Sequence, residues 1–258
     1  SKYRNCFILK GGMLISAMVG IDSRATMDID TTLRNYPLNC ESAEQIVRQI
    51  ADVEIDDKIS FVIKKTEEIM EDSEYQGVRL SLDAYLDKTR IPLKIDISTG
   101  DVITPCEISF SYQLMFENRT IPLLAYPPET VLAEKLETIL SRGEANTRLR
   151  DFYDVYILQR EDFVVTPDAL CHALLATCRK RGHEDLLHTY ASILNEVRQS
   201  GAMREQWMKY QTDFDYAAGI TWDTVLDTVE TLCMKTLDDH AFGDELPQEE
   251  SQFEMHLL

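Results

Sequence analysis

The chain has 258 residues, 44% of them hydrophobic, which is enough for one large domain or two small ones that bury most of their apolar surface. Its 45 acidic and 26 basic residues give a formal net charge of -19, which disfavours non-specific binding to nucleic acid or to anionic membranes. No run approaches the roughly 18 consecutive apolar residues that cross a bilayer, and the N-terminus lacks the long apolar core of a signal peptide. We therefore expect a cytoplasmic protein with no membrane partner.

Residues 7–33 open with a short apolar strand that ends at Gly11 and Gly12. Because this strand follows Ser1 almost at once, we expect the natural protein to carry an upstream segment. The next residues, MLISAMVG, are apolar enough to predict a helix packed against a sheet. The run TMDIDTTL then alternates with a period of two, which places Asp28 and Asp30 on the same face of a second strand.

The middle of the chain predicts one helix and three strands. Residues 41–58 are amphipathic, with Ser42 as the expected N-cap and with Ile46, Ile50 and Val53 on one stripe. The runs FVIKKTEEI, VRLSLDAYL and IPLKIDIST are predicted strands, and the turn-like DKTR joins the last two. We expect a mixed sheet that is covered by helices.

The remainder of the chain changes character near Pro127 and Pro128. IPLLAYPPETVLAEKLETILSR begins as a proline-rich turn and continues as a helix from about Pro128. From there to about residue 237 almost every segment has helical periodicity. The sequence thus predicts an α+β fold, with an α/β half at residues 1–126 and an all-helical half at 127–237. Residues 238–258 begin with DDHAFGDELPQEE, which contains acids and no Lys or Arg and predicts a solvated acidic tail.

The six cysteines are scattered, without a CxxC pair and without a histidine at ligand spacing. This pattern argues against zinc and predicts reduced, mostly buried thiols. The carboxylates are better candidates for a metal site.

Asp28 and Asp30 would repel each other on one strand face unless a cation lies between them. Oxygen ligands alone favour a hard ion such as Mg²⁺. Glycines between a strand and a helix let the backbone approach a phosphate closely at a positive helix end. Taken singly, however, the two acids also fit a solvated strand face, and Gly11 with Gly12 fits a plain tight turn.

Asp96 is a third acid, in a strand whose alternating residues Leu93, Ile95 and Ile97 face the other way. An acid on one strand that faces two acids on a neighbour suits two-metal phosphoryl transfer. We expect the three carboxylates to lie roughly 4 to 6 Å apart, so that a cation relieves their repulsion. Alone, Asp96 also fits an exposed strand acid.

Five motifs occur in the order LKGG, RATMDID, LKID, AEKLETILSR and RDFYD between about residues 6 and 160. Together they resemble the AbiEii-type nucleotidyltransferases, toxins of type IV toxin-antitoxin and phage-defence systems that are related to the MenT toxins. The resemblance implies a polymerase-β-like mixed sheet, Mg²⁺ as cofactor and an NTP as substrate. Gly12 stands where many relatives have serine, so a hydroxyl contact to phosphate is not implied there.

The resemblance also implies roles for the residues of the first motifs. Asp28 and Asp30 would bind Mg²⁺, and Asp96 would be the third carboxylate. Gly12, with Gly11 beside it, would hold the triphosphate.

Lys135 would touch the nucleotide phosphates or base, because a point charge on a rigid helix can neutralise a phosphate. We expect it to be an exposed helix lysine, so that Lys135→Ala leaves the fold intact. Arg24 and Thr26, just before the two aspartates, would support the site, although Arg24 also fits the surface.

Asp151 and Asp154 are three residues apart on one helix face, and one of them would complete the nucleotide pocket. We favour Asp151, because Asp154 could instead hold Arg150 or Lys135. Candidate RNA contacts are the basic residues Arg142, Arg148, Arg150, Arg179, Lys180 and Arg181, which also fit solvated helix ends.

The leading hypothesis is Mg²⁺-dependent transfer of NMP from an NTP to an acceptor hydroxyl. By resemblance the acceptor is the 3′ end of tRNA, the outcome is growth arrest, and a cognate antitoxin is a partner. A second hypothesis has a protein or a small molecule as acceptor, which the negative charge favours. A non-catalytic nucleotide-binding module and a DxD glycosyltransferase are further alternatives, and the latter predicts neither the Gly-Gly turn nor the Lys135 motif.

Overall fold

The structure is a computed structural model and describes residues 1–55, 57–71, 75–115, 117–160 and 165–238. Within these ranges a mixed sheet of seven strands has the order β3-β4-β5-β2-β1-β7-β6. The strands are β1 (Phe7–Lys10), β2 (Asp28–Leu33), β3 (Ile59–Glu71), β4 (Tyr75–Leu86), β5 (Thr89–Ser98), β6 (Ile108–Gln113) and β7 (Thr120–Ala125). The predicted acidic tail lies outside the described residues, apart from Asp238.

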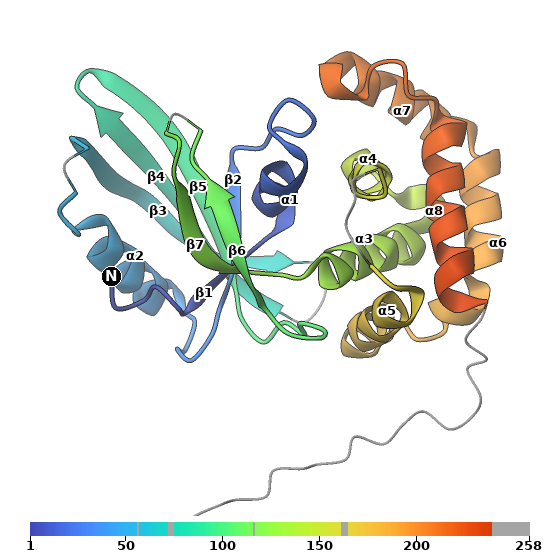
Figure 1. The fold of residues 1–258 in the computed structure, drawn as a ribbon, viewed down its shortest axis with the longest axis horizontal. Coiled ribbons are helices and arrows are strands. Elements are labelled where there is room, and N and C mark those ends of the chain that lie inside the picture. Colours follow the sequence, from blue (N-terminus) through green and yellow to red (C-terminus); the bar gives the residue numbers. More distant parts are fainter. Residues whose placement is uncertain (56, 72–74, 116, 161–164, 239–258) are drawn as a thin grey trace, which may run out of the picture.

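Six α-helices follow the sheet, and two more lie among its strands in the described residues. The two are α1 (Gly11–Val19) and α2 (Cys40–Ala51). The six are α3 (Pro128–Arg142), α4 (Leu149–Leu158), α5 (Pro167–Arg181), α6 (Leu186–Gln199), α7 (Gly201–Asp213) and α8 (Trp222–Leu237). The predicted α+β class, with helices after the sheet, is confirmed (Figure 1). None of the helices in the described ranges is long and apolar enough to cross a bilayer.

Two local predictions are wrong. The helix predicted over residues 41–58 is α2, which ends at Ala51, and its N-cap is Asn39 rather than Ser42. The Asn39 side chain accepts the Ser42 amide at 2.8 Å, and Ser42 Oγ accepts the Asn39 amide at 3.0 Å, so Ser42 is the second half of a capping box.

The second error concerns the stretch before Pro127, which was expected to begin as a turn. It is strand β7, paired parallel with β1 and antiparallel with β6. The sequence does not predict this strand because it contains Pro122, and proline is rare inside sheets. In the structure Pro122 pairs only with β6, whereas β1 pairs with Leu124 and Ala125, so the missing amide is tolerated.

Two hydrophobic clusters hold these layers together. The smaller one lies between α2 and the sheet and includes Ile46 of α2, Leu80 of β4 and Ile97 of β5. The larger one runs from Ile8 of β1 and Leu14 of α1 into the helices that follow Pro127. Because the sheet half and the helical half share this second core, the packing of its side chains determines how the two halves are placed relative to each other. The division into domains at residue 126 stays a prediction.

Candidate functional site

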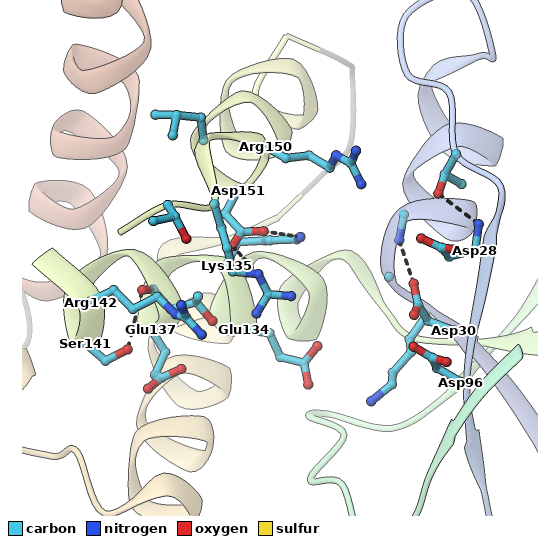
Figure 2. A pocket seen from close by; sticks show the side chains of 18 of the residues that line it. Asp28, Asp30, Asp96, Glu134, Lys135, Glu137, Ser141, Arg142, Arg150 and Asp151 are labelled. Carbon is cyan, nitrogen blue, oxygen red and sulfur yellow. Dashed lines mark hydrogen bonds and ion pairs between the residues drawn. The ribbon is translucent and has the colours of Figure 1, made fainter. Parts of the chain in front are cut away.

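A cleft of about 1000 Å³ lies between the sheet half and the helical half. One wall consists of the end of β1, the start of α1, β2 and β5, and the other consists of α3, α4, α5 and α7. Nine of the ten predicted site residues line this cleft, namely Gly11, Gly12, Arg24, Thr26, Asp28, Asp30, Asp96, Lys135 and Asp151. The close view shows the three acids on one wall and Lys135 with Asp151 on the other (Figure 2).

The three aspartates lie on two adjacent strands. Asp28 and Asp30 belong to β2, and Asp96 belongs to β5, which pairs with β2 in parallel. Asp30 and Asp96 are direct cross-strand partners. Residues paired in this way share a face of the sheet, so both carboxylates are on the cleft side.

The same register extends into a row of four charged residues across β1, β2, β5 and β4. Lys10 pairs with Asp30, Asp30 with Asp96, and Asp96 with Arg79. Arg79 donates two hydrogen bonds to Asp96, from Nε at 2.7 Å and from Nη2 at 2.5 Å. This hydrogen bonding raises the pKa of Arg79 above its ordinary value, so the guanidinium stays charged. The two carboxylates are therefore flanked by two cations.

Lys10 is fixed by a polar network behind the row. Its Nζ lies 3.1 Å from Asp101, which also accepts hydrogen bonds from Ser98 at 2.6 Å and from Thr32. The Tyr126 hydroxyl lies 2.8 Å from Thr32 Oγ1. Burial alone would raise the pKa of Asp101, but Lys10, Ser98 and Thr32 outweigh it and lower the pKa to about 2. Asp101 is thus ionised at neutral pH and holds Lys10 beside the site.

The oxygen donors of this wall suit Mg²⁺ chemically. In the described part of the chain, however, no group of three or more His, Cys, Asp or Glu side chains is placed to hold one metal ion. Both oxygens of Asp96 instead accept hydrogen bonds from Arg79. Asp28 and Asp30 fit as a two-carboxylate ligand set, and the role of Asp96 as a third ligand stays a prediction.

The Gly-Gly turn is built around Asp30. Gly11 has a φ of +63°, and a Cβ at this position would lie 2.2 Å from Asp30 Oδ2. Only glycine fits such a conformation and such an approach. The Gly12 amide donates to the same oxygen at 3.3 Å. In this structure the turn therefore positions a carboxylate, and its contact with a triphosphate stays a prediction.

Lys135 is not the exposed helix lysine that the sequence suggested. Its side chain is 17% exposed, and its Nζ lies 2.5 Å from Asp151 and 3.0 Å from Asp154. Burial alone would lower the pKa of Lys135, but the two aspartates raise it well above its ordinary value. The prediction was wrong because the two acids, three apart on α4, both face α3, which the periodicity of α3 alone does not reveal.

Asp154 joins Lys135 to the sheet half. It accepts from Arg24 Nε at 2.7 Å, and both side chains are at most 1% exposed. Burial alone would raise the pKa of Asp154, but Lys135 and Arg24 lower it overall. The alternative that Asp154 holds Lys135 is confirmed, and among the described residues Arg24, rather than Arg150, forms the second ion pair with Asp154. Arg24 is accordingly a buried bridge between the two halves rather than a surface residue.

Thr26 has a smaller supporting contact. Its Oγ1 accepts the Asp28 amide at 3.4 Å, just where β2 begins. A Cβ on Gly12 would lie 3.0 Å from Arg24 and 3.2 Å from Thr26 Oγ1, so these two side chains pack closely against the turn.

Basic residues line the helical wall opposite the acids. They are Arg142, Arg148, Arg150, Lys180, Arg181 and Lys209. Figure 2 shows Arg150 extending from α4 toward the wall that carries Asp28. Arg179, also a candidate for RNA contact, instead pairs with Glu184 at 3.3 Å. Lys209 was not predicted as a site residue, because it is a single lysine on a polar helix without a motif around it.

Carboxylates on one wall that face a wall rich in Arg and Lys are typical of sites that transfer a nucleotidyl group from a triphosphate. The family comparison agrees with this class. The family described as nucleotidyl transferase AbiEii toxin, type IV TA system, matches residues 1–228. The chain belongs to the AbiEii family, so the resemblance carried by its five motifs is confirmed.

Two solved structures from Helicobacter pylori are similar to this chain. One is described as a candidate nucleotidyltransferase, with 14% identity, a TM-score of 0.46, and coverage of 92% of this chain and 90% of the other. The other, JHP933, has 13% identity, a TM-score of 0.46, and coverage of 91% and 87%. A search of curated proteins gives no match.

Proposed function

We propose that this protein is a Mg²⁺-dependent nucleotidyltransferase that transfers NMP from an NTP to an acceptor hydroxyl, and that it is the toxin of a type IV toxin-antitoxin system. Membership of the AbiEii family supports the activity and the toxin role. The observation that carries the proposal is the single cleft that nine of the ten motif residues line.

Asp28 and Asp30 would hold the Mg²⁺, which when bound supplies charge neutralisation for the triphosphate and for the leaving pyrophosphate. The Gly11 turn keeps Asp30 at the mouth of the cleft by its close approach and by the Gly12 amide. Asp96, on the same face as Asp30, would take the proton of the acceptor hydroxyl once Arg79 no longer holds both of its oxygens. Pyrophosphate is then the leaving group.

Asp151 is the better candidate for contact with the nucleotide. Its Oδ2 is buried and has no hydrogen-bond partner among the described residues, although Arg148 Nε lies 3.7 Å away. Asp151 as a residue lines the cleft, and a carboxylate oxygen can accept from a ribose hydroxyl or a base amino group. Asp154 lies behind it, and both of its oxygens are bound by Arg24 or Lys135.

Lys135 would act as part of a neutral group rather than as a single positive charge. With Arg24 it balances the charges of Asp151 and Asp154. The attraction for phosphates therefore falls mainly on the other basic residues of the helical wall, apart from Arg181, which pairs with Glu137 and Glu134. This supports a polyanionic acceptor, the 3′ end of tRNA, despite the net charge of the whole chain.

An acceptor assay tests this choice. The protein is incubated with Mg²⁺, each α-labelled NTP in turn, and either total tRNA or a total protein extract. We expect label on tRNA, and a strong loss with Arg148→Gln and Arg150→Gln. Arg119→Gln is a matched control, because Arg119 is 61% exposed and pairs with Glu117 outside the cleft. Label on proteins alone would favour a protein acceptor, and no transfer with any NTP would contradict the proposal.

The toxin role also implies growth arrest and a cognate antitoxin. Expression of the protein alone should arrest growth, and co-expression of its antitoxin gene should relieve the arrest, whether or not the two proteins bind. Relief of phage infection by the pair would support a defence role.

A further inference from the structure

The charged row contains one cation that the proposed function does not use. Arg79 comes from β4 and lines the cleft, with a side chain that is 38% exposed. Its two nitrogens bind the two oxygens of Asp96, whose side chain is only 13% exposed. A bidentate arginine-carboxylate pair is the strongest and most directional form of this contact.

We propose that Arg79 is an ionic latch on Asp96, which a divalent cation must open before Asp96 can join its ligands. The inference rests on the proposed function, because it assumes that Asp28 and Asp30 hold the metal. Asp96 stands beside Asp30 in register, so a cation bound there lies next to the guanidinium. Two cations close to one carboxylate repel each other, and the metal and Arg79 therefore compete for Asp96.

The position of Arg79 also indicates that nucleotide binding favours its release from Asp96. Once released, its guanidinium stays on the cleft wall, where an incoming triphosphate offers it new oxygen acceptors. The phosphate oxygens of the nucleotide thus replace the Asp96 carboxylate as hydrogen-bond acceptors for Arg79. The metal should accordingly bind weakly to the nucleotide-free protein and more tightly with the nucleotide present.

Binding of Mn²⁺, followed by the electron paramagnetic resonance signal of the free ion, tests the latch without measuring activity. For the nucleotide-free protein we expect Arg79→Gln to tighten Mn²⁺ binding by about tenfold, within the usual range of coupling between sites. The added effect of a non-hydrolysable NTP should be smaller in this variant than in the wild type. Asp96→Asn should remove most of the difference that Arg79→Gln makes.

Arg90→Gln is the matched control. It removes the same charge from β5, six residues from Asp96 and so about 20 Å along the strand, where Arg90 is 61% exposed and lies 3.5 Å from Asp83. It should bind Mn²⁺ as the wild type does. Arg79→Lys keeps the charge without the fork, and an intermediate affinity is expected, which provides a second test if Arg79→Gln does not fold.

Three results would overturn the latch. They are an unchanged or weaker affinity in folded Arg79→Gln, an equal gain in Arg90→Gln, and a gain that persists unchanged in the Asp96→Asn background. Failure of the proposed function looks different. In that case the wild type binds no Mn²⁺ even with the nucleotide, or Asp28→Asn and Asp30→Asn leave binding unaffected.

Discussion

Lys135→Ala should destabilise the protein strongly, because the side chain is an ion-pair partner of two buried acids. Removing it leaves Asp151 without its 2.5 Å partner, and Asp154 with Arg24 alone. Breaking a buried ion pair on one side costs about 3 to 5 kcal/mol. Because Lys135 reaches the cleft and Asp154 keeps Arg24, the lower end applies, about 3 kcal/mol. In a chain of this size this lowers Tm by about 6 to 12 °C.

Urea and thermal unfolding followed by circular dichroism at pH 7 measure this effect. The matched control is Lys235→Ala, an exposed lysine in the last turn of α8, which should change stability by no more than about 0.5 kcal/mol. Adding Asp151→Asn to Lys135→Ala should recover part of the loss, because the uncompensated charge is then removed. A free energy of unfolding for Lys135→Ala within about 0.5 kcal/mol of the wild type would show that Lys135 does not stabilise the two buried acids.

Three further outcomes follow from the site and the core. Gly11→Ala should cost roughly 1 to 3 kcal/mol in unfolding experiments and weaken Mn²⁺ binding, because its Cβ would displace Asp30, and unchanged binding would contradict this. The pKa of Asp101 is lowered from 3.8 to about 2 by Lys10 and two hydroxyls against the effect of burial, so its stabilisation is present above pH 3.8 and lost as the pH falls through 2. Asp101→Asn should therefore remove about 2 kcal/mol of acid-dependent stability, visible as a flatter urea midpoint against pH. Among the six free thiols, Cys106 is exposed and should react first with a thiol reagent at pH 8, whereas the three buried ones should react only on unfolding.

The elements of this fold were largely predictable because their patterns are local. The period of two around Asp28 and Asp30 depends on neighbouring residues only, and so does the helical period after Pro128. Strand β7 was missed because Pro122 contradicts the local preference, and only its place beside β6 resolves the contradiction. Local sequence preference therefore fails to identify a strand when pairing with neighbouring strands determines whether that strand forms.

The candidate site, too, was predictable from the sequence only in part. The motifs predicted that Asp28, Asp30 and Asp96 share one face of the sheet, since alternation along each strand determines which side chains lie on that face. They did not reveal Arg79 and Lys10 as neighbours of these acids, because register between distant strands is not a local property. The burial of Lys135 depends likewise on how α4 packs against α3. The motif that contains Lys135 does not reveal which acidic residues of α4 pair with it.

NMP transfer by Asp28→Asn and Asp30→Asn, measured with purified protein, labelled NTP, Mg²⁺ and tRNA, tests whether these two aspartates hold a catalytic metal. Each change removes a negative metal ligand and preserves the side-chain shape. A bound metal stabilises the transferring phosphoryl charge by several kcal/mol, and each 1.36 kcal/mol is about tenfold in rate. We therefore expect transfer to fall by about a hundredfold or more in each folded variant, and growth arrest to disappear. Asp52→Asn, an exposed acid at the end of α2, should keep full activity. A folded Asp28→Asn/Asp30→Asn double variant that still transfers NMP, or still arrests growth, would contradict the account.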